Sequence, residues 1–346
     1  MKTHRHWTTC LVVALVFGFA GIAVAQAQKP LVVTSWGGAY QEAQRKAHLD
    51  AFTKATGIKI VEASPTDYGK LEAMIKSGNV EWDAVDVDLD YVIRAGKKGL
   101  LEKLDYAKLG LKKEDFLPGT QFDYGTGNIF YSTIMAWNAK KIPPGLTPTG
   151  WADFWDVKKF QGPRALWKYP LATLEAALIA DGAPIDKLYP LDVDRAFRSL
   201  DKIKPHVTVW WETGAKPAQL LTDGEVVMAS AWNGRIQTVM KQGVPVAFTW
   251  NGGALAGDAW AIPKGVKNLE AALKFIAFTQ SAKQQAELTK YIEYGPTHKG
   301  AFQFIDPKAD LPTTPSNRVV QVIVDVNWWV ENFDKVNERF LAWVAK

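Results

Sequence analysis

The stretch LVVTSWGGAYQEAQRKAHLDAFTKATGIKIV, residues 31–61, decides the fold class. Its apolar start, residues 31–35, predicts a short strand that ends at the turn residues Trp-Gly-Gly, 36–38. Residues 39–55 then place apolar or small side chains at a helical period. A second strand is expected at residues 58–61. Strand, helix and strand in this order predict a βαβ unit with parallel strands.

The alternation continues after this unit. Helices are expected at residues 68–76 and 91–98, on either side of a strand at 84–87, and a longer strand is expected at 128–138. The Pro- and Gly-rich residues 143–150 then form the best candidate for a domain boundary.

A second series of elements follows the boundary. Gly252, Gly253 and Gly257 are expected to loosen the chain before a return strand. Strands are expected at 164–167, 207–210, 226–230 and 259–263, and helices at 172–180, 194–202, 217–221, 234–241, 269–288 and 319–345. Two such series predict an α/β protein with two halves, each a mainly parallel sheet flanked by helices.

The composition is that of a globular protein of 346 residues, 47% hydrophobic and 22% charged. This mixture excludes collagen, coiled-coil rods and disordered tails, and the length favours two domains. The net charge is +5, from 41 Lys+Arg against 36 Asp+Glu, and the basic residues are scattered. Neither nucleic acid nor a membrane is therefore expected as a partner. The 15 Trp residues indicate recognition surfaces as well as a core.

The first 27 residues have the pattern of a cleaved secretory signal peptide. Lys2 and Arg5 precede the apolar residues 11–24, and Ala25-Gln26-Ala27 supplies small residues two apart. Cleavage after Ala27 would remove Cys10, the only cysteine. The mature protein would then have no disulfide, no catalytic thiol and no cysteine-bound metal. We expect a soluble protein exported to the periplasm.

Motifs of several enzyme classes are absent from the sequence. The three histidines that remain after cleavage, His48, His206 and His298, lack the spacing of a zinc site. There is no Gly-x-Ser-x-Gly nucleophile elbow and no Gly-x-Gly-x-x-Gly dinucleotide fingerprint. Neither a metal nor a cofactor is expected. A hydrolase or lyase acting on sugars stays open, because 36 acidic residues always offer pairs of carboxylates.

Aromatic and charged residues gather near the ends of the expected strands, where ligands bind in open α/β sheets. Core packing explains any single Trp, but this many at strand ends indicate a binding site. Trp faces around a carboxylate bind an ammonium group, each face contributing roughly 0.5–2 kcal/mol. The candidate ligand-binding residues are Trp36, Trp82, Asp83, Asp86, Trp210, Trp211, Trp232, Arg235 and Asp258.

Four motifs carry a family resemblance. They are SWGGAYQEAQRKAHLDAFTKATGIKI (35–60), WADFWDVKKFQGPRAL (151–166), LLTDGEVVMASAWNGRI (220–236) and AGDAWAIPKG (256–265). Together they resemble the polyamine-binding branch of the type II periplasmic solute-binding proteins, which serve ABC importers. The resemblance covers essentially the whole mature chain. It implies two lobes, joined by two crossover strands, that close on a ligand and are recognised by an inner-membrane permease.

The resemblance also implies roles for single residues. Trp36 matches an aromatic position that stacks on the ligand, and Trp232 matches the Trp of the second-lobe WNG motif. Asp258 matches the acid that takes an amino group in polyamine binders. Trp210 or Trp211 would add an aromatic wall.

Two departures from the family pattern affect the expected ligand. Ala256-Gly257 replaces an aromatic residue before Asp258, and Arg235 directly follows the WNG motif. Inside the cleft, Arg235 would repel the second ammonium of a diamine and hold a carboxylate instead; pointing outward, it would be a solvated cation. Asp83 and Asp86 could contact the ligand or be structural acids.

The sequence therefore predicts a monomeric, non-enzymatic binding protein. Its ligand would be a polyamine such as putrescine or spermidine, or an ω-amino acid such as 4-aminobutyrate. The first lobe is expected to comprise residues 28–135 and 256–305, and the second lobe residues 136–255 and 306–346. A secreted, Trp-lined carbohydrate hydrolase or lyase is the alternative.

Overall fold

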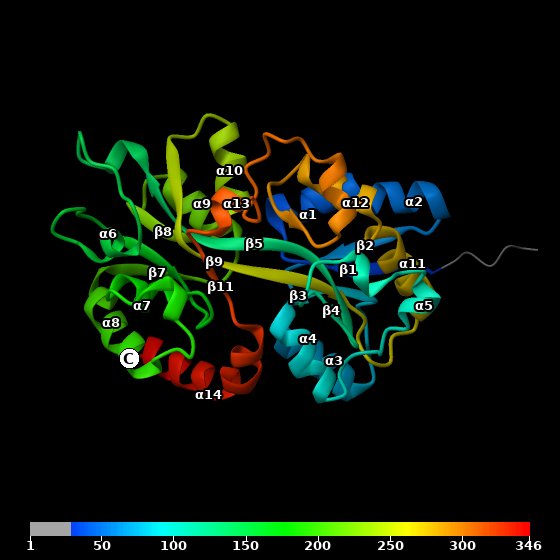
Figure 1. Ribbon diagram of the computed structural model, residues 1–346. Helices are drawn as coiled ribbons and strands as arrows, with labels where there is room; N and C mark the ends of the chain where they lie inside the picture. The colour runs from blue at the N-terminus through cyan, green and yellow to red at the C-terminus, as the bar shows by residue number, and fades with distance from the viewer. Residues whose placement is uncertain (1–28) are drawn as a thin grey trace, which may run out of the picture.

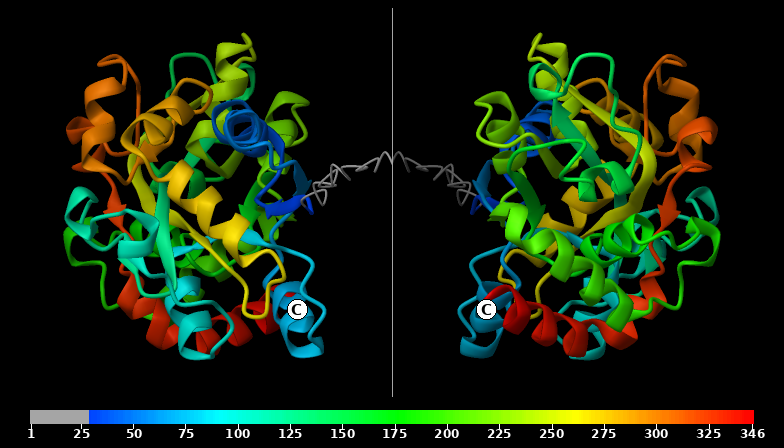
Figure 2. Two further views of the ribbon diagram at one scale, coloured as in Figure 1. Left: turned by 90° about the vertical axis from the view of Figure 1, so that its right-hand side faces the viewer. Right: turned by 90° about the vertical axis from the view of Figure 1, so that its left-hand side faces the viewer.

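Two α/β lobes lie side by side in the computed structural model and share one continuous sheet (Figure 1). The structure describes residues 29–346, so the expected signal peptide lies outside the described residues. The strands follow the order β2-β1-β3-β9-β5-β8-β6-β7. Helices surround the strands in both lobes (Figure 2). The α/β class predicted from the sequence is confirmed.

The first lobe is built on three parallel strands. Strand β1 pairs with both β2 and β3 in parallel register. Its strands are β1 (Leu31–Thr34), β2 (Ile60–Ala63) and β3 (Ala84–Asp88), and its helices are α1 (Gly38–Gln44), α2 (Asp50–Thr56), α3 (Tyr68–Ser77), α4 (Leu89–Lys97), α5 (Tyr106–Leu109), α11 (Leu269–Thr279) and α12 (Ala282–Thr289). A π-helical turn, Arg45–Leu49, joins α1 to α2, so the expected helix over 39–55 is continuous.

The second lobe repeats this plan. Strand β6 pairs in parallel with β7 and β8. Its strands are β6 (Arg164–Trp167), β7 (Val207–Trp211) and β8 (Met228–Trp232), and its helices are α6 (Trp151–Trp155), α7 (Thr173–Ala180), α8 (Val193–Ile203), α9 (Ala215–Thr222), α10 (Asn233–Lys241) and α14 (Val326–Val344). Helix α14 also reaches across to α4 of the first lobe.

Two long strands, β5 (Gly125–Asn138) and β9 (Val246–Ala261), cross from one lobe to the other (Figure 1). They pair antiparallel with each other along most of their length. Strand β9 also pairs with β3, and β5 pairs with β8, both antiparallel. The remaining short elements are β4 (Gln121–Phe122), β10 (Gly295–Pro296), β11 (Val322–Ile323) and α13 (Pro315–Arg318).

The predicted loosening at three glycines is wrong, because all three lie inside β9. A Cβ at Gly253 would lie 2.7 Å from Oγ of Ser132, and one at Gly257 would lie 2.7 Å from the carbonyl oxygen of Ile129. Both neighbours belong to β5, so glycine allows the two crossover strands to approach closely. The short return strand expected at residues 259–263 overlaps the C-terminal end of β9.

Two predicted helices also need correction. The expected helix over 269–288 ends at Thr279, and Ser281 caps a new helix, accepting a hydrogen bond from the Gln284 amide. The last helix begins at Val326 rather than near residue 319, because Asp325 caps it through the Trp328 amide. The chain before that cap forms β11 instead, in parallel with β9.

Candidate functional site

The centre of the site is a pair of carboxylates on adjacent strands. The antiparallel register of β3 and β9 places Asp88 directly opposite Asp258. Both side chains are buried, with 4% and 3% of their surface exposed. Burial raises the pKa of Asp258 well above its ordinary value, and the carboxylates of Asp86 and Asp88 raise it further. A cation placed here would relieve that electrostatic cost.

Asp88 organises two phenols around this point. Its carboxylate accepts hydrogen bonds from the hydroxyls of Tyr68 (2.6 Å) and Tyr131 (3.0 Å). Burial, together with the nearby Asp90, raises the pKa of Asp88 to about 7, while the two phenols lower it. Tyr68 in turn lies edge-on to the Trp36 ring. Asp88 therefore connects the carboxylate pair to the aromatic wall.

Asp86, two residues earlier on β3, is a structural acid by its contacts. Its Oδ2 accepts hydrogen bonds from Tyr40 Oη (2.7 Å), Gln44 Nε2 (2.7 Å), Ser35 Oγ (3.3 Å) and Asn128 Nδ2 (3.2 Å). These donors come from the first lobe and β5, and they fix the position of Tyr40. We therefore assign Asp86 a supporting place behind the site.

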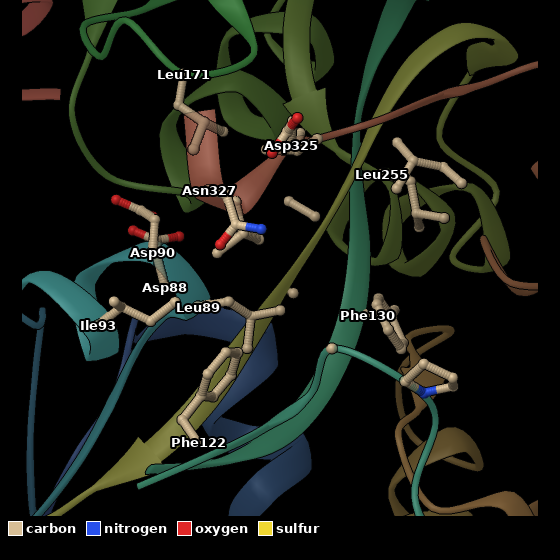
Figure 3. Close-up of a pocket in the computed structure, with 17 residues that line it drawn as sticks. Asp88, Leu89, Asp90, Ile93, Phe122, Phe130, Leu171, Leu255, Asp325 and Asn327 are labelled. Carbon is tan, nitrogen blue, oxygen red and sulfur yellow. The ribbon is translucent and has the colours of Figure 1, made fainter. Parts of the chain in front are cut away.

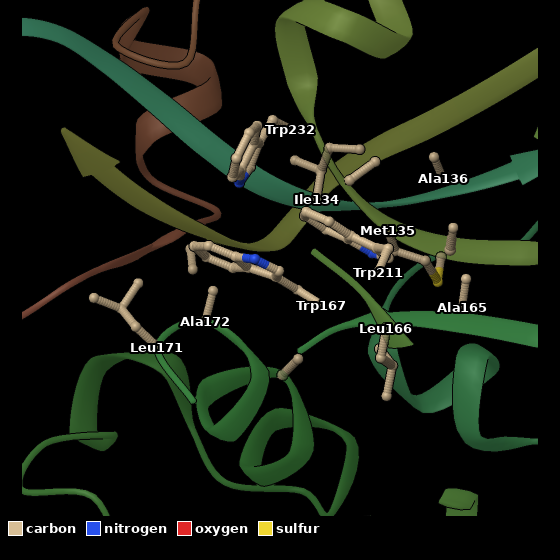
Figure 4. Close-up of a cluster of buried hydrophobic side chains, with 14 of the residues drawn as sticks. Ile134, Met135, Ala136, Ala165, Leu166, Trp167, Leu171, Ala172, Trp211 and Trp232 are labelled. Atoms are coloured by element: carbon tan, nitrogen blue, oxygen red, sulfur yellow. The ribbon is translucent and has the colours of Figure 1, made fainter. Parts of the chain in front are cut away.

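Tryptophans from both lobes meet over the carboxylates. Trp36 follows β1 and Trp232 ends β8, and their ring centroids are 6.1 Å apart in an edge-on arrangement. Behind Trp232, the rings of Trp167 and Trp211 stack with centroids 5.4 Å apart, and both lie edge-on to it (Figure 4). The second-lobe wall is therefore a rigid group of three indoles.

Arg235 lies in the interior between the lobes, with 2% of its surface exposed. Arg235 is a residue of α10 in the second lobe. Its guanidinium nevertheless donates hydrogen bonds to the carbonyl oxygens of Gly37 (2.9 Å) and Trp36 (3.2 Å) in the first lobe. Its guanidinium carbon lies 5.1 Å from the Trp232 ring centroid. Burial lowers its pKa, although Asp258 counteracts this. The solvated-cation alternative left open by the sequence is therefore wrong.

A small cavity of about 10 Å³ lies at this junction, lined by Trp36, Tyr40, Asp88, Ile129, Tyr131, Trp232, Asp258 and Tyr294. We call it the inner cavity. A volume of roughly 10–15 Å³ accommodates one water molecule. Trp36, Asp88 and Trp232 also line a wider cleft of about 360 Å³ between the lobes, with Tyr68, Trp167 and Tyr169. Any organic ligand of the inner cavity therefore requires the two lobes to move apart.

Four buried polar atoms at the junction lack hydrogen-bond partners among the described residues. They are Asp258 Oδ1, Trp36 Nε1, Trp232 Nε1 and Arg235 Nε. Buried polar atoms are nearly always paired in folded proteins, and leaving one unpaired costs about 1–3 kcal/mol. The unpaired acceptor and donors at one junction mark it as a place for a polar ligand.

A third space lies on the other side of Asp88. This cavity of about 280 Å³ is lined by α4, by residues 255–257 of β9 and by the start of α14 (Figure 3). Its walls are mainly apolar: Leu89 lies beside Asp88, and Phe130 and Leu255 lie across the cavity from Asp88 and Asp90. Because α4 and α14 belong to different lobes, its shape depends on their relative position.

Three of the residues singled out from the sequence lie away from this junction. Asp83 lies just before the N-terminal end of β3, where its carboxylate accepts a hydrogen bond from the Val32 amide (2.8 Å). Trp82 is buried in a separate first-lobe core. Trp210 packs on Phe340 and on another α14 ring, Trp343, while its neighbour Trp211 belongs to the indole group. Successive strand residues point to opposite faces, so only one of the pair reaches the site.

The sequence reasoning missed several residues that line the junction. They are Tyr40, Tyr68, Asp88, Tyr131, Trp167 and Tyr294. Asp88 is among the charged residues near the end of the third expected strand, and its position two residues after Asp86, on the same face, is the signal that favours it as a site residue. The tyrosines carry no local signal of this kind.

The structure also gives two general observations. Within residues 29–346, no helix is long and apolar enough to cross a membrane. In the same described part, no group of three or more His, Cys, Asp or Glu side chains is arranged to hold a metal ion.

Comparison with known proteins gives one consistent family. The model of the bacterial extracellular solute-binding protein family matches residues 47–315. The gamma-aminobutyric acid-binding protein of Pseudomonas aeruginosa is 39% identical over 95% of both chains. The spermidine/putrescine-binding periplasmic protein 1 of Haemophilus influenzae is 30% identical over 71% of this chain and 70% of its own.

Solved structures agree with this relationship. The Atu4243-GABA receptor is 41% identical, covers 92% of this chain and 98% of its own, and superimposes with a TM-score of 0.80. The PBP AgtB from Agrobacterium tumefaciens R10, in complex with agropinic acid, is 35% identical. It covers 92% of this chain and 99% of its own, with a TM-score of 0.86. These relatives are named as binding proteins or receptors, which gives no support to the carbohydrate hydrolase or lyase alternative. The chain belongs to the bacterial extracellular solute-binding protein family and has the two-lobed architecture of an ABC importer's substrate-binding protein.

Proposed function

We propose that this protein binds a small ω-amino acid of the 4-aminobutyrate class between its lobes and delivers it to an ABC importer. The observation that carries the proposal is the burial of Arg235 between the lobes, where it is close enough to the Asp258 carboxylate for that charge to raise its pKa. A diamine has no group for the guanidinium, whereas a zwitterion matches both poles. The name of the Pseudomonas aeruginosa relative supports the same class of ligand.

In this proposal the ammonium lies against Asp258 and Asp88, next to the edge-on pair of Trp36 and Trp232. An ammonium that loses its water needs an opposing charge with good hydrogen bonds, and the unpaired Oδ1 of Asp258 supplies both. The indole faces add roughly 0.5–2 kcal/mol each.

The ligand carboxylate is assigned to Arg235. Two of its nitrogens already hold the first lobe, and its Nε has no partner among the residues described. A carboxylate beside this guanidinium would accept a charge-assisted hydrogen bond. The ligand then contacts the carboxylates beside β3 and a side chain of α10, so binding favours an arrangement in which both lobes touch the ligand, slightly wider than the one in this structure.

Calorimetric titration with 4-aminobutyrate and putrescine tests this assignment. Wild-type protein should prefer 4-aminobutyrate, and Arg235→Ala should abolish its binding, since the ligand carboxylate would be buried unpaired. The same change should leave putrescine binding unchanged or improved. Arg195→Ala, which removes a half-exposed arginine paired with Asp181 in the second lobe, is the matched control. Tight putrescine binding that is insensitive to Arg235→Ala would favour a polyamine instead.

The setting of this function is also part of the proposal. The protein would be a periplasmic monomer, released by cleavage after Ala27, with lobes at 28–135 plus 256–305 and 136–255 plus 306–346. It would bind its ligand without turnover and present the closed state to a permease. Intact mass of the exported protein, light scattering and recovery of unchanged ligand test these points; a retained N-terminus, a dimer or a converted ligand would each contradict one of them.

A further inference from the structure

Three glycines surround the guanidinium of Arg235. Gly37 and Gly38 follow Trp36 with φ angles of 70° and 58°, in the left-handed region that favours glycine. This backbone turns the carbonyl oxygens of Trp36 and Gly37 toward Arg235, which donates to both. Gly214 approaches from the opposite lobe, just before α9.

The missing side chains of two of these glycines make the space for the guanidinium. A Cβ on Gly38 would lie 2.7 Å from an Nη atom of Arg235. A Cβ on Gly214 would overlap the Trp232 ring most closely, at Cζ3 and Cε3, and would lie 2.6 Å from Nε of Arg235. Distances below 3.0 Å essentially never occur for real Cβ atoms, so Arg235, Trp232 or the backbone would have to move.

We propose that Gly38 and Gly214 are specificity-determining positions, because together they form the slot that holds Arg235 in the cleft and so select a ligand with a carboxylate. The inference rests on the proposed function for the ligand's chemistry. Gly38 closes the slot from the first lobe and Gly214 from the second. A methyl group at either position displaces the guanidinium from the two carbonyls and from the ligand's anionic end, while the carboxylates of Asp88 and Asp258 stay in place.

Gly214→Ala is the sharper variant. Its φ of −65° and ψ of −16° suit any residue, so the substitution brings no backbone strain and acts through the new contacts with Trp232 and Arg235. A shift of Trp232 affects both ligands, whereas a shift of Arg235 affects only the ligand that carries a carboxylate. Overpacking of this kind should weaken 4-aminobutyrate binding by roughly tenfold to a hundredfold. Putrescine binding should change less, so the ratio of the two affinities falls. Gly69→Ala, at an exposed helical glycine of α3, is the matched control and should leave the ratio unchanged.

Gly38→Ala adds backbone strain as well as the new contact. A second control variant measures the cost of that strain separately. Gly78 has a similar φ of 72°, and a Cβ there would meet nothing within 4 Å, so Gly78→Ala measures the strain alone. In wild-type background, Gly38→Ala should lower the unfolding midpoint by more than Gly78→Ala does. In an Arg235→Ala background, the two substitutions should cost the same, because the atom that the new Cβ meets is gone.

The two measurements separate this inference from the proposed function. Wild-type protein that binds no 4-aminobutyrate would contradict the proposed function, and the unfolding comparison would then decide on the slot. Gly214→Ala protein with an unchanged affinity ratio would overturn the specificity role. An unfolding cost of Gly38→Ala that persists without Arg235 would overturn the slot itself.

Discussion

The two sides of the cleft use different chemistry for the same ligand. The first-lobe side, with the adjoining end of β9, presents carboxylates whose positions are fixed by phenols, as Asp88 is by Tyr68 and Tyr131. The second-lobe side presents stacked indoles and a single guanidinium. One side therefore supplies negative charge and the other supplies shape and positive charge. Their contributions to binding should be separable by substitution.

Between the carboxylates and the indoles, the larger effect is expected from the carboxylates. Asp258→Asn keeps the shape and removes the charge, so the affinity for the amine should fall by roughly 2–4 kcal/mol. Calorimetry with 4-aminobutyrate measures this directly. Asp83→Asn, at the far end of β3, changes the same chemical group away from the cleft and should leave affinity unaltered. Equal affinities of Asp258→Asn and wild-type protein would remove Asp258 from the site.

This contrast was only partly visible in the sequence. Local patterns were enough to predict βαβ units, the second series of strands and the residues after them, because each depends on neighbours along the chain. The pairing of Asp88 with Asp258 depends on the register of strands far apart in the sequence. No local pattern specifies such a register, so the sequence marks Asp258 as a charged residue near a strand end and as a family match but does not predict that Asp88 lies opposite it.

The aromatic residues show the same limit. Trp210 and Trp211 look equivalent in the sequence, but the pleat sends one toward α14 and the other toward Trp232. Trp82 and Asp83 were selected because they adjoin a strand, although they precede it. Ligand sites of α/β sheets lie beyond the carboxyl ends of the strands, and Asp88 occupies that end of β3.

A smaller effect is expected on the indole side. Trp232→Ala should lower the affinity by about 1–2 kcal/mol, because it removes one cation–π face and its packing. Trp210→Ala also deletes a large ring from the second lobe, but that ring packs on Phe340 and Trp343. Both variants should be less stable, yet only the first should bind more weakly. A loss of affinity in Trp210→Ala as large as in Trp232→Ala would contradict this division.

A further effect is expected from pH. The pKa of Asp88 is about 7, so below neutral pH this carboxyl group holds a proton that a bound ammonium must displace, and burial also raises the pKa of the neighbouring Asp258. Affinity for 4-aminobutyrate should therefore rise with pH from about 5.5 to 7.5, by at most about tenfold per unit for each proton released. Titration at pH 7 in two buffers of different ionisation enthalpy counts those protons.

The same raised pKa values also determine how the stability of the ligand-free protein changes with pH. Unfolded carboxyl groups titrate near pH 3.9, so between about pH 4 and 7 the folded state binds more protons than the unfolded state. The contribution of Asp88 and Asp258 to stability is therefore complete at acid pH and is lost as pH rises through the raised values. Asp88→Asn should reduce that loss, because an amide does not titrate, and it should also flatten the pH dependence of binding. Thermal unfolding of both proteins at pH 5 and pH 8 measures the first effect. Identical pH profiles for the two would show that the first-lobe carboxylate stays ionised throughout, and the charge on that side of the cleft would then be permanent.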